Sequence, residues 1–140
     1  MQTPSEQLAT LNEEALRGLV RAFYAKVRED EVLGPIFEGA IGDWPAHLER
    51  LTAFWSSVIL GTGRYKGNPF AAHLRHAETI DPSMFDRWLA IWHETTASRF
   101  PTEAAALLQL KADRIAESIK AGLFFRPDLA VVERQAARSA

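Results

Sequence analysis

The residues best able to hold a metal ion in this sequence are four histidines, His47, His73, His76 and His93. The sequence has no cysteine, which excludes disulfides, thiolate nucleophiles, zinc sites of the cysteine type and iron–sulfur centres. Any metal chemistry must therefore depend on histidine, on carboxylates or on a prosthetic group.

The spacing of the histidines argues against a bare zinc or copper ion. A metalloprotease-type site places two histidines four residues apart on one helix with a glutamate beside the first, and no such pair occurs here. His73 and His76 lie three residues apart and could share a metal. The turn formers Gly67, Asn68 and Pro69 just before them make a rigid helical site unfavourable.

Aromatic side chains recur along several predicted segments. A haem group needs one neutral imidazole on its iron and an apolar slot for its porphyrin, and these rings could line such a slot. Aromatic rings at helical spacing are more often ordinary core, and periodicity alone favours that account. The rings concerned are Phe23, Phe37, Phe54, Trp55, Phe70, Phe85, Trp88 and Trp92.

The elements that would position these residues are helices. Apolar residues with three-and-four spacing predict a first helix that begins after Asn12 and ends near Gly34 and Pro35. Because proline disfavours helical geometry in the residue before it, we expect Ile36 and Phe37 to lie in a tight corner. A second helix is predicted to begin after Asp43 and to end at glycines 61 and 63.

The second half of the chain is also predicted to be helical. In residues 64–80 the apolar residues show no sustained periodicity, so this segment is expected to form a loop with one short helical stretch. The Asp81-Pro82 pair predicts the start of a helix that ends at Pro101, and a last helix runs from Thr102 to Gly122. Its predicted inner face carries Leu107, Leu110, Ile115 and Ile119. Five helical segments and no strand are therefore expected.

Size and charge favour one globular domain. A chain of 140 residues with 47% apolar residues can supply a single core. With 16 Lys and Arg against 18 Asp and Glu there is no excess positive charge for a nucleic acid partner. No apolar stretch approaches the roughly 20 residues of a membrane span, and the start of the chain does not resemble a secretion signal. A cytoplasmic location is expected.

Three segments carry a resemblance to a known family. The runs FYAKVREDEVLGPIF, DWPAHLERLTAFWSSVILGTGRYKGNPF and MFDRWLAIW, in this order, closely resemble the truncated haemoglobins of the third group. The resemblance extends from about Leu19 to Trp92. It implies an all-α, globin-like fold shortened to a two-over-two helical sandwich. The domain is expected to span residues 1–127, because the chain after Pro127 is rich in Ala, Arg and polar residues. Residues 128–140 are expected to form a tail, either a short helix or disordered.

The resemblance also implies a cofactor and its binding residues. Haem b would be held by His73, which matches the proximal histidine that bonds the iron, and the iron would be five-coordinate. Phe37 matches the phenylalanine that packs on the porphyrin. Tyr24, His47 and Trp88 match the polar residues of the distal side, where ligands bind, and are the candidates for catalysis.

Further residues are expected around the porphyrin. The resemblance assigns Leu51, one turn after His47, to the contact with the bound ligand, and Phe54 is expected to line the apolar slot. Arg50, Tyr65 and His76 are candidates for the haem propionates, because cationic and hydroxyl groups suit two carboxylates. His93, beside polar residues, is expected to be a solvated surface residue.

The distal residues indicate the function. Hydrogen-bond donors such as the Tyr24 hydroxyl and the Trp88 indole would hold bound dioxygen longer, which is unfavourable for a carrier and useful for nitric oxide or peroxide chemistry. Several roles are open to His47: a sixth iron ligand, a third donor, a gate at the rim or a proton donor. Turnover would require a separate reductase. An oxygen-binding or sensing protein without turnover and a haem-free interaction module are the alternatives.

Overall fold

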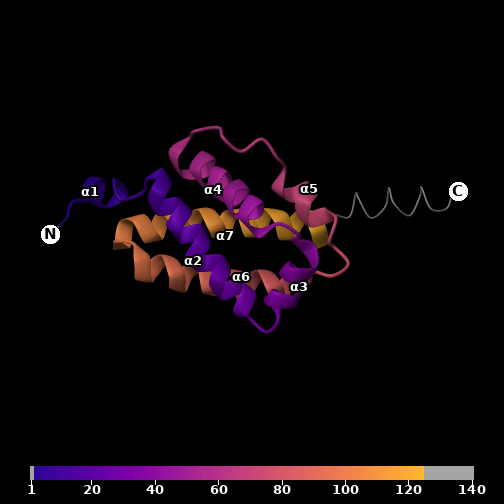
Figure 1. The fold of residues 1–140 in the computed structure, drawn as a ribbon. Coiled ribbons are helices and arrows are strands. Elements are labelled where there is room, and N and C mark those ends of the chain that lie inside the picture. Colours follow the sequence, from indigo (N-terminus) through magenta and orange to yellow (C-terminus); the bar gives the residue numbers. More distant parts are fainter. Residues whose placement is uncertain (1, 125–140) are drawn as a thin grey trace, which may run out of the picture.

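The computed structural model describes residues 2–124, and within that range the chain forms helices and no strand (Figure 1). This confirms the expected all-α class. The helices are α1 (Pro4–Leu8), α2 (Glu13–Glu29), α3 (Leu33–Ala40), α4 (Trp44–Leu60), α5 (Pro69–Leu74), α6 (Pro82–Arg99) and α7 (Thr102–Phe124). The predicted tail over residues 128–140 lies outside the described residues.

Two pairs of long helices make up the body of the fold. Helix α2 packs on α4, α6 packs on α7, and contacts between α2 and α6 join the two pairs. Figure 1 shows α6 and α7 side by side, with α5 beside the C-terminal part of α7. This is the expected two-over-two sandwich. The large side chains at its centre are fully buried and come from all four helices, namely Leu16, Leu19, Phe23, Trp55, Trp92 and Leu108.

Capping side chains set the start of the long helices where the sequence predicts. Asn12, Asp43 and Asp81 each accept a hydrogen bond from the backbone N–H three residues later, over 2.9, 3.1 and 3.3 Å. Gly61 ends α4 in the left-handed conformation, with φ at 69°. The short helical stretch expected within residues 64–80 is confirmed as α5.

The prediction that Ile36 and Phe37 lie in a non-helical corner is wrong, because α3 runs through both residues. The side chain of Asp30 begins this helix by accepting hydrogen bonds from the backbone N–H groups two and three residues later, at 3.0 and 2.9 Å. Pro35 falls in the first turn of α3, where its missing N–H removes no helical hydrogen bond. The first predicted helix is therefore two helices, α2 and α3.

Three further details differ from the expectation. Helix α1 was not predicted either, so together with the division into α2 and α3 the described residues hold seven helices instead of five. Helix α7 continues past Gly122 to Phe124. On α7, Leu110 is 44% exposed and Leu108 is fully buried, so the predicted inner face was wrong at Leu110.

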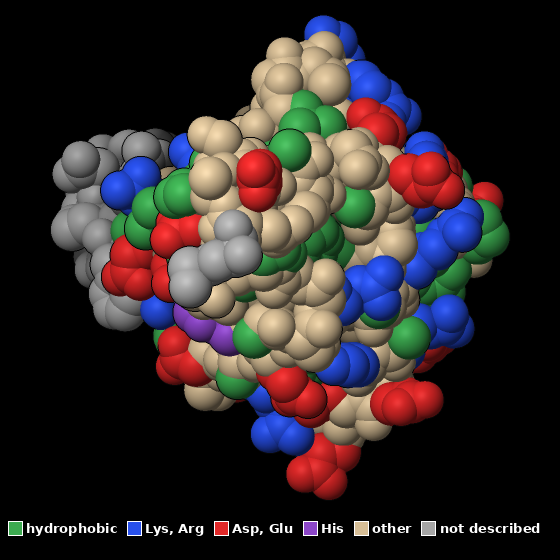
Figure 2. All heavy atoms as spheres, turned by 90° about the vertical axis from the view of Figure 1, so that its left-hand side faces the viewer, with side chains coloured by type: hydrophobic (Ala, Val, Ile, Leu, Met, Phe, Trp, Pro, Cys, Tyr) green, Lys and Arg blue, Asp and Glu red, His purple; other side chains and the backbone are tan. Residues whose placement is uncertain are grey.

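Charged side chains of both signs cover the outside of the helices. Figure 2 shows the end of the molecule that lies at the left of Figure 1, where Lys and Arg side chains are interspersed with Asp and Glu. Ion pairs connect neighbouring elements: Arg17 meets Glu49 across α2 and α4 at 3.0 Å, and Arg87 of α6 meets Asp30 at 2.7 Å. Within residues 2–124, every helix is too short or too polar to cross a membrane.

Candidate functional site

Three side chains predicted for the distal side lie together with Phe37, which was predicted to pack on the porphyrin, and the four form a distal group. Tyr24 of α2 is buried, and its ring centroid lies 5.6 Å from that of Phe37 of α3 and 5.8 Å from that of His47 of α4. Trp88 of α6 makes a side-chain hydrogen bond to Tyr24. Four helices thus each bring one predicted residue to the same region.

Burial fixes the protonation states of the two titratable groups in this distal group. It raises the pKa of Tyr24 to about 12, an effect that the Trp88 hydrogen bond partly offsets, so the phenol remains a donor at physiological pH. Burial lowers the pKa of His47 to about 4, and the positive charge of Arg50 acts in the same direction. The His47 imidazole is therefore neutral and carries one donor and one acceptor nitrogen.

His73 lies in α5 with its ring oriented by a backbone contact. Its Nδ1 atom is 2.7 Å from the carbonyl oxygen of Pro69, to which a protonated Nδ1 donates. The lone pair of Nε2 is then free. The ring lies 6.0 Å from that of Phe85. Burial lowers the pKa of His73, although the Pro69 hydrogen bond acts against this, and the charge of His76 lowers it further. A neutral imidazole is the form that binds a metal.

Local sequence explains the position of α5. Asn68 caps the helix by accepting a hydrogen bond from the N–H of Ala71 at 3.2 Å, and Pro69 occupies its first position. Phe70 then packs directly against the backbone of Gly122 in α7, where a Cβ would overlap the ring. The Gly-Asn-Pro-Phe sequence therefore both starts α5 and attaches it to α7.

The remaining predicted residues are half-buried or exposed. Tyr65 packs edge-on against Phe54 with ring centroids 5.2 Å apart. Leu51 and Phe54 are partly buried against the core. Arg50 and His76 are exposed, and in addition to burial their charges lower the pKa values of the half-buried His47 and His73, respectively.

Sequence reasoning missed Trp44. Its ring centroid lies 5.5 Å from that of His47 and 6.1 Å from that of Tyr24, and the guanidinium of Arg28 lies 4.4 Å from it. The available signal was its position three residues before His47 on the same helix, since residues with that spacing share a helix face.

Two buried nitrogen atoms of this region bear on whether its residues fit a cofactor. Trp44 Nε1 and His47 Nε2 are buried and have no hydrogen-bond partner in the described part of the chain. Folded proteins seldom leave such groups unpaired. The large apolar side chains nearby are only partly buried, among them Phe37, Leu51, Phe54 and Trp88. Unpaired polar atoms beside partly covered aromatic surface fit a porphyrin together with a small polar ligand.

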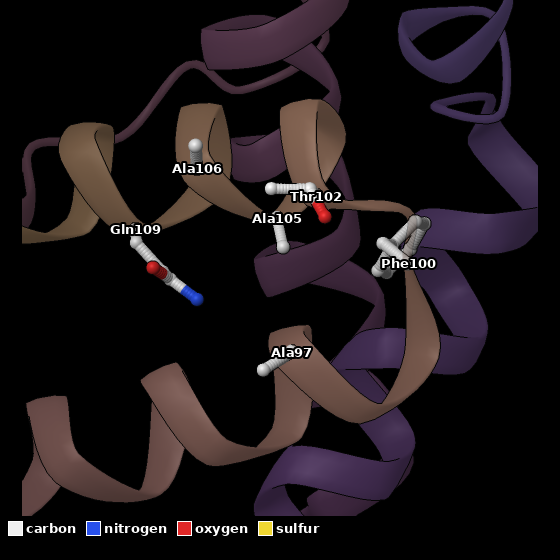
Figure 3. A pocket seen from close by; sticks show the side chains of 6 residues that line it. All are labelled: Ala97, Phe100, Thr102, Ala105, Ala106 and Gln109. Atoms are coloured by element: carbon white, nitrogen blue, oxygen red, sulfur yellow. The ribbon is translucent and has the colours of Figure 1, made fainter. Parts of the chain in front are cut away.

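Elsewhere in the described residues, 2–124, no comparable arrangement occurs. A separate hollow of about 220 Å³ lies between α6 and α7, lined by Ala97, Phe100, Thr102, Ala105, Ala106 and Gln109 (Figure 3). None of the predicted site residues lines it. His93, expected to be solvated, is partly exposed, with its Nε2 2.8 Å from Oδ1 of Asp113. Over residues 2–124, no cluster of three or more His, Asp or Glu side chains could hold a metal ion.

Comparison with known proteins relates this geometry to a family. No protein-family model matches the chain. The chain is 33% identical over 119 residues to Group 3 truncated hemoglobin ctb of Campylobacter jejuni, a match that covers 82% of this chain and 93% of the relative. It also superposes on the crystal structure of a group III truncated hemoglobin from Campylobacter jejuni with a TM-score of 0.74 and 31% identity, covering 81% of this chain and 92% of that one. The globin-like fold is thereby confirmed, and the chain belongs to the group III truncated haemoglobin family.

Proposed function

We propose that this chain binds haem b through Nε2 of His73, and that it binds dioxygen and related small ligands beside Tyr24, His47 and Trp88. The observation that carries the proposal is the buried, neutral Tyr24, whose ring lies 5.8 Å from that of His47, together with the unpartnered Nε2 of His47. Together they form a polar ligand site within aromatic surroundings. The Campylobacter jejuni relatives, both named hemoglobins, support it.

His73 would hold the haem iron, which when bound supplies a centre for diatomic ligands and for electron exchange. The hydrogen bond from Nδ1 to Pro69 orients the imidazole and increases the basicity of Nε2. With His73 as the one protein ligand, the iron would be five-coordinate and would leave the distal side open to ligands. The porphyrin would pack on Phe37, Leu51 and Phe54, and its propionates would meet Arg50, Tyr65 and His76.

The distal side chains determine how long a ligand remains. The Tyr24 hydroxyl is a donor, and the Trp88 indole N–H, which bonds to Tyr24 in this structure, would turn to a bound ligand as the second donor. Each hydrogen bond to a partly charged acceptor contributes about 1.5–3 kcal/mol. Two such bonds slow the release of dioxygen by roughly several hundredfold or more. Slow release is unfavourable for a carrier and favourable for chemistry on the ligand.

His47 adds a group that can exchange protons. As a neutral imidazole it can accept and release a proton at Nε2, which reduction of peroxide requires. Two kinds of turnover are consistent with this donor set, oxidation of nitric oxide and reduction of peroxide. Oxidation of nitric oxide would leave ferric iron, so it needs a separate reductase to restore the ferrous state. Reduction of peroxide needs an electron donor to supply its two electrons. An oxygen-binding or sensing protein without turnover is the second candidate.

The absorption spectrum of purified protein tests haem binding. Protein from cells supplied with haem should be red and show the intense Soret band. Colourless protein from such cells would contradict the proposal. Stopped-flow kinetics then separate the two candidates. If the ferrous, oxygen-saturated protein reacts with nitric oxide no faster than oxygen dissociates, the nitric oxide dioxygenase activity is excluded.

A further inference from the structure

Trp44 and His47 form a pair with complementary, unused hydrogen-bonding groups. Their rings meet edge-on at 85° with centroids 5.5 Å apart. Of the three buried side-chain atoms without a hydrogen bond among residues 2–124, Glu13 Oε1 is in an ion pair with Arg64, and the other two are Trp44 Nε1 and His47 Nε2. The two atoms that lack any partner therefore belong to neighbouring rings.

Contacts on its other sides keep the Trp44 ring in place. The guanidinium of Arg28 lies 4.4 Å from the ring centroid, and Nε of Arg28 is in turn bound to Oε1 of Glu38 at 2.7 Å. Phe37 lies 6.4 Å from the ring at an angle of 32°. Residues of α2 and α3 thus hold the indole, so its N–H has a defined direction.

The chemistry of the two nitrogens indicates the kind of partner that would satisfy both. Indole Nε1–H can only donate, whereas Nε2 of the neutral His47 can accept. A molecule that satisfies both must accept one hydrogen bond and donate another. Buried water does this in most folded proteins, typically with about three hydrogen bonds. The Tyr24 ring, 5.8 Å from His47 and 6.1 Å from Trp44, belongs to the same group.

We propose that Trp44 is a positioning residue of the distal ligand site, which acts through one bound water molecule. Its N–H donates to the water, and the water donates to Nε2 of His47, which holds that imidazole toward Tyr24. The remaining O–H of the water then points to the ligand side. This inference rests on the proposed function, since the ligand side exists only if haem is bound.

The substitution Trp44→Phe tests the proposal because it keeps an aromatic ring for Arg28 and removes the N–H. In haem-loaded protein we expect oxygen to dissociate roughly 2–12 times faster, as the loss of one neutral hydrogen bond implies. We also expect a shifted C–O stretching frequency in the carbon monoxide complex. In a His47→Leu background, Trp44→Phe should have little further effect on either measurement, because Trp44 acts through His47.

Nuclear magnetic resonance gives a test that does not depend on haem. The indole proton of Trp44, assigned by its loss in Trp44→Phe, should show a nuclear Overhauser effect to a long-lived water. Its absence overturns the proposal, as does an equal effect of Trp44→Phe with and without His47. Failure of the proposed function is recognised separately, because wild-type protein would then be colourless whatever the result for Trp44.

Discussion

His73 and Pro69 are joined by a hydrogen bond of 2.7 Å between Nδ1 and the carbonyl oxygen, one turn apart in α5. The bond uses a carbonyl at the start of the helix that carries the histidine, so the same short segment places the imidazole and selects its tautomer. His76, three residues later, is exposed. His73 is therefore the better candidate for a metal ligand, because its imidazole is half-buried and oriented, whereas His76 is exposed.

Replacement of His73 by Gly should abolish haem binding, and added imidazole should restore it by filling the vacated position. The matched variant His76→Gly should retain haem, because an exposed side chain contributes at most to the rim. Haem content is measured from the absorption spectrum of purified protein. Retention of haem with an unchanged spectrum in His73→Gly would show that another residue binds the iron.

Replacement of Tyr24 by Phe should increase the oxygen dissociation rate roughly 10- to 150-fold, because it removes one hydrogen bond to a partly charged acceptor. The buried ring itself is preserved, so packing changes little. Carbon monoxide takes on less charge when bound, so its dissociation rate provides a control that should change less. An unchanged oxygen dissociation rate would contradict the hydrogen-bond account.

The sequence predicts most helices because their signals are local. Asn12, Asp43 and Asp81 are followed by regular apolar spacing, and each caps a helix as expected. Helix α1 also carries a local signal, the capping box of Thr3 and Glu6, but it has five residues and no buried side chain. Periodicity cannot detect so short a helix.

Helix α3 was missed for a different reason. Pro35 was interpreted as a helix breaker, although in the first turn of a new helix it breaks nothing. The capping acceptor, Asp30, also forms an ion pair with Arg87. That contact spans 57 residues, so its contribution to the start of α3 is invisible in local sequence.

The distal group could be predicted only through the family resemblance. Its members come from four helices, so neither spacing nor periodicity shows that Tyr24, Phe37, His47 and Trp88 meet. Trp44 was missed because a tryptophan at the start of an amphipathic helix resembles ordinary core. Its unpartnered N–H becomes evident only in three dimensions.

Replacement of the two glycines of α3 by alanine should change the free energy of unfolding in opposite directions. A Cβ at Gly34 would lie 2.5 Å from the backbone oxygen of Arg28, whereas one at Gly39 would meet nothing within 4 Å. Gly34→Ala must displace backbone, so we expect it to lower the free energy of unfolding by about 1–3 kcal/mol. Gly39→Ala should raise it by about 0.5–1 kcal/mol through better helix propensity. Urea denaturation of both variants measures the difference, and equal effects would show that α3 does not pack as described.

The depressed pKa of His47 predicts a pH dependence of stability. Its ordinary pKa of 6.5 applies to the unfolded chain, and burial lowers the pKa to about 4 in the folded protein. Between these values the unfolded state binds a proton that the folded state does not, so the free energy of unfolding falls as the pH decreases from 6.5 to 4. Below about 4 both states are protonated, and His47 contributes no further change.

The variant His47→Gln isolates this contribution, because Gln does not titrate in this range. Its free energy of unfolding should decrease less than that of the wild type between pH 6.5 and 4, and the two curves should be parallel above pH 6.5. Other groups, His73 included, titrate in both proteins and cancel in the comparison. Nuclear magnetic resonance titration of the His47 ring protons provides the direct measurement. A midpoint at the ordinary value of 6.5, with parallel curves throughout, would mean that the imidazole is solvated instead of enclosed beside Tyr24.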